Sequence, residues 1–222
     1  MDPKVLAGRK ATEFIKDGMI VGLGTGSTAY HTIIRVGELI TEGLKIRAVC
    51  TSLKTCELAC SLNIPCLPLD EVKCIDLTID GADEIDPAGN GIKGGRGALL
   101  YEKIVASNSK QNIWVISDHK LVETLGAFPL PVEVIPLGYT MLLRRFEELG
   151  FNPVLRKTDN EVFITDSRNY IIDLYLESIV DPYETGRLLK TFPGVVEHGL
   201  FLDTVNTAIA ASETTARVIR FR

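Results

Sequence analysis

The stretch from Asp76 to Ala106, DLTIDGADEIDPAGNGIKGGRGALLYEKIVA, decides the fold of this chain of 222 residues. From residue 75 to Asp80, apolar side chains alternate with polar ones, which is the period of a β-strand. Gly81 breaks the pattern, so Asp80 is predicted to lie where the strand ends. Ligands of open α/β sheets gather at the carboxyl ends of strands, and this predicts a functional position for Asp80.

A glycine-rich turn and a helix complete the stretch. The turn is Lys93-Gly94-Gly95-Arg96-Gly97, and residues 98–106 have the apolar character of a buried helix. Glu102 lies on this helix, where it has little reason to face water. Burying a carboxylate alone is costly, so Glu102 is predicted to be paired or functional.

Toward the amino terminus, a short apolar strand at 19–23 precedes a second glycine loop and a helix at about 29–42. The loop reads GTGST, residues 24–28. Glycines let a backbone approach a ligand, and a helix amino terminus offers free N–H groups to an anion. Two interpretations remain open: a phosphate cradle with hydroxyl donors, or a tight turn with Ser/Thr helix caps. The pattern matches neither GxxxxGK[ST] nor GxGxxG, which disfavours a nucleotide site.

Further strands are expected at 46–50 and 112–117, with helices between them. Alternating strands and helices predict a parallel sheet covered on both faces. Asp118, His119 and Lys120 follow the strand at 112–117. Lys120 is a second basic group at the expected ligand edge, or else a solvated charge. His119 has no spacing that pairs it with a nucleophile, so no role is assigned to it.

The pattern changes near residue 128, where strands come closer together. The expected elements are strands at 132–135, 154–156, 162–165, 170–176 and 195–201, and helices at 139–149 and 182–191. This is an α+β layer, so a smaller domain is predicted at 128–202 and a larger one at 1–127 plus 203–222. Strand-like segments at 205–211 and 216–221 are expected to return to the first sheet as its edge.

Composition narrows the possible functions. Hydrophobic residues make up 45% of the chain and the net charge is −5, which argues against a general binder of nucleic acid or anionic membranes. No apolar run has the length of a membrane span, and the amino terminus has no apolar signal core. A cytoplasmic protein is the simplest expectation.

The five cysteines are Cys50, Cys56, Cys60, Cys66 and Cys74. An odd number argues against a closed disulfide framework. Cys56 and Cys60 are four apart on a predicted helix and can share a face, but a metal site would want His or paired-Cys spacing. The expectation is therefore reduced structural thiols, with no metal ligands and no cofactor.

The acidic and basic groups of the opening stretch suit proton transfer on an anionic substrate. A buried glutamate such as Glu102 can serve as general base, and Lys93 or a backbone N–H can stabilise an oxyanion. Asp80 or Asp83 can move a proton to or from a hydroxyl. Clustered carboxylates can instead hold Mg²⁺, but Lys93 among them favours proton transfer.

The sequence resembles the ribose-5-phosphate isomerase type A family. The motifs GLGTGSTA, DLTIDGADEID, KGGRGALLYEKIVA, SDHK and FPLPVEVIP occur in the family's order, and PGVVEHGLF follows from Pro193. The resemblance implies interconversion of D-ribose 5-phosphate and D-ribulose 5-phosphate through a cis-enediolate, without a metal, in the pentose phosphate pathway. It also implies a Rossmann-like domain with an inserted α+β, ferredoxin-like domain, and a homodimer or homotetramer.

The resemblance assigns roles position by position. It makes Glu102 the catalytic base, with Asp80 the proton carrier in ring opening and Lys93 beside the enediolate oxygen. The substrate-binding positions that it implies are Thr25, Gly26, Ser27, Thr28, Asp80, Gly81, Ala82, Asp83, Lys93, Gly94, Gly95, Arg96 and Lys120.

Two residues depart from the family pattern: Arg96 stands where glycine is common, and Tyr101 where arginine is common. A different class of function, a sugar-phosphate sensor of the same fold, is the alternative. Such sensors usually begin with a DNA-binding helical domain and need no base at Glu102.

Overall fold

The computed structural model describes residues 2–221, which divide into two compact units. The first unit contains the described residues up to Ala82, Tyr101–Leu121, and those from Thr204 onward. The second contains Asp83–Leu100 and Val122–Asp203. Residues 83–100 therefore group with the second unit, whereas the sequence analysis placed them with the first.

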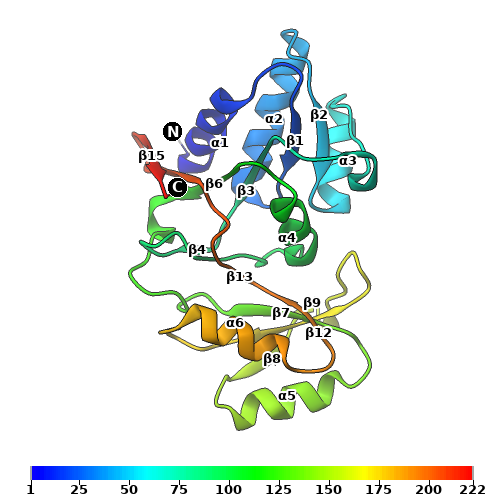
Figure 1. Ribbon diagram of the computed structural model, residues 1–222, viewed down its shortest axis with the longest axis vertical. Coiled ribbons are helices and arrows are strands. Elements are labelled where there is room, and N and C mark those ends of the chain that lie inside the picture. Colours follow the sequence, from blue (N-terminus) through cyan, green and yellow to red (C-terminus); the bar gives the residue numbers. More distant parts are fainter. Residues whose placement is uncertain (1, 222) are drawn as a thin grey trace. The chain divides into compact units, whose positions relative to one another are not determined.

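A mixed sheet of six strands, counted over residues 2–221, forms the centre of the first unit, in the order β15-β14-β6-β3-β1-β2 (Figure 1). Its strands are β1 (Ile20–Leu23), β2 (Arg47–Cys50), β3 (Leu77–Gly81), β6 (Asn112–Ser117), β14 (Thr207–Ala211) and β15 (Ala216–Arg220). Neighbouring strands are parallel except for β15, which runs antiparallel to β14. The predicted parallel sheet and the return of the last two strands to its edge are confirmed.

Strand alternation divides the core of this unit into two faces. On one face, Val21 and Leu23 pack with Ile33 of α2 (Ser27–Thr41) and with α1 (Pro3–Ala11) and α3 (Leu53–Ser61). On the other face, Val49 packs with Val105 of α4 (Leu99–Ser107). Single 3₁₀ turns cover Thr12–Phe14, Leu69–Glu71 and Asp118–Lys120. The first of these turns follows α1 directly.

The strand order creates a switch point between β1 and β3. The chain leaves β1 for β2 on one side and later enters β3 on the other. Leu23 pairs with Ile79, so the loop after β1 and the end of β3 meet at the same edge of the sheet. Open α/β sheets bind ligands at such a point.

The second unit contains a four-stranded antiparallel sheet among its described residues, in the order β12-β7-β11-β8. Its elements follow the chain as β7 (Leu130–Val134), α5 (Tyr139–Glu148), β8 (Pro153–Leu155), β11 (Tyr170–Leu174), α6 (Pro182–Lys190) and β12 (Val195–His198). This is a βαββαβ unit, the ferredoxin-like arrangement that was predicted. The strand expected at 162–165 is reduced to a short hairpin of β9 (Lys157–Thr158) and β10 (Glu161–Val162).

A small antiparallel sheet joins β4 (Glu84–Ile85), β5 (Gly91–Ile92) and β13 (Leu200–Phe201). The prediction of one strand over 195–201 is therefore wrong, because β12 and β13 belong to different sheets. The chain changes sheet at Gly199, whose N–H donates to Pro131 O at 2.7 Å. A Cβ at this position would lie 2.3 Å from Lys93 O, so a side chain does not fit.

Among the described residues, none of the helices has the length and apolarity needed to span a membrane.

Candidate active site

Asp80 is held at the end of β3 by backbone donors. Its Oδ1 accepts hydrogen bonds from Thr25 N at 2.9 Å and from Gly81 N at 2.7 Å. The side chain is only 2% exposed. Gly24 makes the close approach possible, since a Cβ there would lie 2.1 Å from Asp80 Oδ1. The charge of this carboxylate is thus stabilised by oriented N–H groups at the switch point.

The loop after β1 leads directly into α2. Gly26 is the N-cap residue, with φ at 130°, a conformation that L side chains rarely adopt. Ser27 and Thr28 form the first turn, Ser27 exposed and Thr28 buried. Because the cap is a glycine, the interpretation of Ser/Thr helix caps does not describe this helix. The first N–H groups of a helix carry partial positive charge and attract anions.

Thr25 positions this loop through its side chain. Its Oγ1 lies 2.8 Å from Thr51 Oγ1, 2.8 Å from Ser52 Oγ and 3.0 Å from Thr55 Oγ1. Thr55 Oγ1 in turn donates to Gly24 O at 3.0 Å. The sequence analysis did not single out these three partners.

Glu102 lies in the first turn of α4 and is 3% exposed. The expectation that this glutamate would be buried is confirmed. Its helix packs through Val105 against Val49 and Ile75, which explains why this face is turned from water. A carboxylate placed in this way is a candidate general base.

Lys120 lies at the carboxyl end of β6, and its Nζ donates to Ala82 O at 2.7 Å. It thereby fixes the segment that follows Asp80 and Gly81, a role that neither of the two interpretations of Lys120 included. The neighbouring His119 is exposed.

In the second unit, Asp83 organises the glycine-rich turn that follows Lys93. Its backbone N–H donates to Ile92 O at 2.8 Å, and its Oδ2 accepts from Gly95 N at 2.8 Å. Gly94 has φ at 104°, and a Cβ there would lie 2.7 Å from the side chain of Leu99. Arg96 is exposed. The carboxylate and the glycines together fix the backbone of the turn.

Lys93 is 2% exposed, an unusual state for a lysine. Its backbone N–H donates to Gly199 O at 2.9 Å, and its Nζ lies 5.2 Å from the centre of the Phe201 ring. A cation near the face of an aromatic ring is attracted by the quadrupole of the ring. A buried cation of this kind can stabilise negative charge that develops on a substrate.

Two supporting residues were missed by the sequence analysis. Glu84 accepts from Gly126 N at 2.7 Å and from Phe128 N at 2.6 Å. Arg156 donates to Gly94 O at 2.8 Å and pairs with Asp173. The acid-rich run after Gly81 was a signal for Glu84, whereas Arg156 lies too far along the chain for its contact to be anticipated.

Comparisons with known proteins point to one family. The family model of ribose 5-phosphate isomerase A (phosphoriboisomerase A) matches residues 47–215. The chain is 51% identical to ribose-5-phosphate isomerase A of Streptococcus pneumoniae (strain Hungary19A-6), covering 99% of this chain and 97% of that protein. It is 52% identical to the Streptococcus gordonii protein of the same name, over 97% of this chain and 96% of the relative.

Solved structures agree with the sequence relatives. A D-ribose-5-phosphate isomerase in complex with phospho-erythronic acid is 36% identical, with a TM-score of 0.95 over 99% of this chain and 98% of the other. Ribose 5-phosphate isomerase A from Methanocaldococcus jannaschii is 37% identical, with a TM-score of 0.93 and the same coverage.

Proposed function

This chain belongs to the ribose 5-phosphate isomerase A family, and we propose that Glu102 is the general base of the isomerisation that it catalyses. The enzyme is an aldose–ketose isomerase that interconverts D-ribose 5-phosphate and D-ribulose 5-phosphate. The observation that carries the role of Glu102 is its burial, 3% exposed, in the first turn of α4. Sequence reasoning reached the same residue independently from the apolar character of that helix.

The proposed reaction begins with opening of the sugar ring, in which Asp80 carries the proton between the ring oxygen and the C1 hydroxyl. Glu102 then removes the proton from C2 of the aldose, and the electron pair forms the C1–C2 double bond of a cis-enediolate. Lys93 stabilises the negative oxygen of this intermediate. The proton of the C2 hydroxyl moves to O1, Glu102 returns the carbon-bound proton to C1, and C2 becomes the carbonyl carbon of the ketose. One base suffices because C1 and C2 are adjacent.

The phosphate is proposed to bind at the amino terminus of α2. Gly26, Ser27 and Thr28 offer backbone N–H groups there, and two of them add hydroxyl donors. The hydrogen bonds of Thr25 to Thr51, Ser52 and Asp80 support a positioning role for this residue. The phosphate thereby anchors the substrate away from the carbon atoms that react.

The remaining predicted binding positions are proposed to hold the sugar through backbone and side-chain groups. They are Gly81, Ala82 and Asp83 after β3, Gly94, Gly95 and Arg96 in the glycine-rich turn, and Lys120 after β6. The hydrogen bonds Lys120 Nζ to Ala82 O and Gly95 N to Asp83 Oδ2 support fixed backbones at these positions. The side chain of Arg96 is exposed, and no specific contact with the sugar is proposed for it.

The decisive experiment is a coupled assay with ribose 5-phosphate, repeated in heavy water. Proton transfer through an enediolate should introduce solvent deuterium at C1 of ribulose 5-phosphate. Turnover without such exchange would indicate a hydride shift instead. A sugar-phosphate sensor would bind substrate without turnover, and the family relationship does not favour that alternative.

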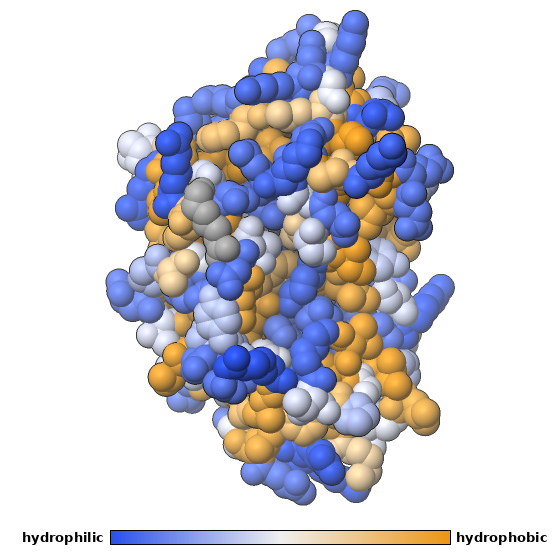
Figure 2. Space-filling model, viewed as in Figure 1, coloured by the Kyte–Doolittle hydropathy of each residue, from blue (hydrophilic) through white to orange (hydrophobic). Residues whose placement is uncertain are grey.

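Self-association is proposed to involve the second unit. Leu137 and Val180 are 85% and 92% exposed there. Patches of apolar surface are visible in the space-filling view (Figure 2). Exposed apolar surface is typical of protein–protein contacts. Light scattering would distinguish a monomer from the expected dimer or tetramer.

A cytoplasmic location also remains a prediction.

A further inference from the structure

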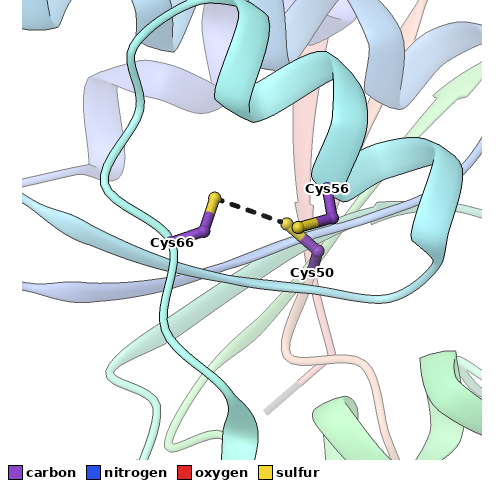
Figure 3. A group of neighbouring side chains, drawn as sticks. All are labelled: Cys50, Cys56 and Cys66. Atoms are coloured by element: carbon purple, nitrogen blue, oxygen red, sulfur yellow. Dashed lines mark hydrogen bonds between the residues drawn. The ribbon is translucent and has the colours of Figure 1, made fainter.

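Three cysteine side chains converge beside β2, the edge strand of the six-stranded sheet. Cys50 ends β2, Cys56 lies on α3, and Cys66 lies on the segment that returns alongside β2, where Ala48 and Cys66 form a bridge. Their sulfur atoms point toward one another from these three segments (Figure 3). The Sγ atoms of Cys50 and Cys66 are 3.8 Å apart, and all three lie within 4.8 Å of one another.

These distances match the requirements of a thiolate metal site. A tetrahedral zinc ion with Zn–S bonds of about 2.3 Å holds its sulfur ligands about 3.8 Å apart. Cys50 and Cys66 already have this spacing. Cys56 needs a shift of about 1 Å or less to reach it, which a change of side-chain torsion can supply.

The surroundings of the three thiols also permit a metal ion to bind. All three are half-buried, so an ion can enter from solvent, and Cys60 lies exposed one helical turn beyond Cys56. Thiolate is the form of cysteine that binds metal ions.

We propose that Cys50, Cys56 and Cys66 form a binding site for one thiophilic metal ion such as Zn²⁺, separate from the chemistry of isomerisation. Three sulfur ligands select soft or borderline ions over Mg²⁺ and Ca²⁺. Each thiol that binds releases its proton to water. The fourth coordination position faces solvent and takes a water molecule.

The site is close in sequence to the residues that order the glycine loop. Cys50 precedes Thr51 and Cys56 follows Thr55, and the hydroxyls of both threonines contact Thr25 Oγ1. A serine variant of either cysteine can therefore disturb this network, so metal binding has to be measured directly and activity is not a suitable readout.

The first test is anaerobic titration of the reduced enzyme with Co²⁺, followed by displacement with Zn²⁺. The wild type should develop a thiolate-to-cobalt charge-transfer band and the d–d bands of tetrahedral cobalt, saturating at one ion per chain. Cys66→Ser and Cys56→Ser should weaken binding on the order of tenfold or more. Cys74→Ser is the matched control, because the Cys74 thiol bonds to backbone carbonyls of Ile75 and Asn108 and should not take part.

The second test uses the wild type alone, so that it does not depend on how the variants fold. Zn²⁺ should slow alkylation of Cys50, Cys56 and Cys66 by iodoacetamide, measured by peptide mass spectrometry, and leave Cys74 unchanged. Absence of a charge-transfer band in the wild type would overturn the proposal. So would equal alkylation rates with and without Zn²⁺, or equal cobalt affinity in Cys66→Ser and the wild type.

Discussion

The backbone N–H of Thr25 donates a 2.9 Å hydrogen bond to Oδ1 of Asp80, which joins the loop after β1 to the end of β3. The bond forms only because Gly24 allows the two segments to touch: a Cβ on Gly24 would lie 2.4 Å from Asp80 Cα. The loop proposed to bind phosphate and the carboxylate proposed to carry a proton are thus fixed by one contact. The geometry at this edge of the sheet therefore depends on the absence of a side chain at Gly24.

Gly24→Ala should therefore destabilise the protein and lower its activity together. Overpacking of this kind costs typically about 1–3 kcal/mol. Chemical denaturation would measure the loss of unfolding free energy. Gly81→Ala is the matched control for stability, because the nearest atom to its Cβ would be 3.8 Å away. Equal destabilisation by the two substitutions would show that the contact with Asp80 is not the cause.

Ser27→Ala and Thr28→Ala should raise KM for ribose 5-phosphate while changing kcat little. Each removes a hydroxyl donor from a site that holds a phosphate remote from C1 and C2. Hydrogen bonds to charged groups are worth about 1.5–3 kcal/mol, so KM should rise on the order of tenfold. Steady-state kinetics would measure both constants, and inorganic phosphate should compete weakly with substrate.

Thr41→Ala is the control for these two variants. Thr41 ends the same helix, and its hydroxyl donates to Gly37 O at 3.1 Å, so its loss should leave KM unchanged. Normal substrate affinity with slow turnover in Ser27→Ala and Thr28→Ala would show that the amino terminus of α2 does not bind phosphate.

Isomerisation should proceed without a divalent metal ion. The proposed positive charge beside the enediolate oxygen is the ammonium of Lys93, which is buried against Phe201. Activity should therefore survive dialysis against a chelator, with metal content checked by mass spectrometry. Loss of activity that Mg²⁺ restores would contradict the assignment of this role to Lys93.

Glu133 should make stability depend on pH. It lies on β7 and accepts from Thr165 and Asn169, but burial raises its pKa above the usual value of 4.5. The folded state then holds this proton more tightly than the unfolded state, so stability falls as pH rises from the unfolded pKa through the folded one. Glu133→Gln stays neutral and should lose this part of the decline. Denaturation midpoints of both proteins, compared across this range, would measure the difference.

Local patterns predicted the elements that position Asp80 and Glu102. The alternation before Asp80 and the apolar helix around Glu102 need only neighbouring residues, and both side chains are buried at the expected places. The change of sheet at Gly199 could not be predicted in this way. Gly199 lies against the backbone of Lys93, which is far away in the sequence.

The convergence of the cysteines also depends on contacts between distant parts of the chain, so it could not be predicted from local patterns. The sequence analysis predicted reduced structural thiols, because the cysteines lack the His or paired-Cys spacing of a metal site. Parallel pairing of Ala48 with Cys66 brings the sulfur atoms of Cys50 and Cys66 together, and that pairing depends on the whole sheet. The hydroxyl contacts of Thr25 likewise join three segments. The glycine loop at 24–28 was therefore predicted, but the hydrogen bonds that hold it in place were not.

Glu102→Gln should nearly abolish isomerisation while leaving the fold and substrate binding intact. The amide keeps the shape of the side chain on α4 but cannot accept the C2 proton. Loss of a general base costs on the order of 10²–10⁴ in rate. The coupled assay would measure turnover, and deuterium incorporation at C1 in heavy water would measure proton transfer itself. Both should fall together in this variant.

Two comparisons make the result specific to Glu102. Glu147→Gln removes an exposed carboxylate near the end of α5 and should retain wild-type turnover. Asp83→Asn should have a smaller effect than Glu102→Gln, because Asp83 fixes the glycine-rich turn through Gly95 N and is not proposed to take the C2 proton. If Glu102→Gln kept near-normal turnover and exchange, another group would have to be the base, and the burial of Glu102 would then serve only the packing of its helix.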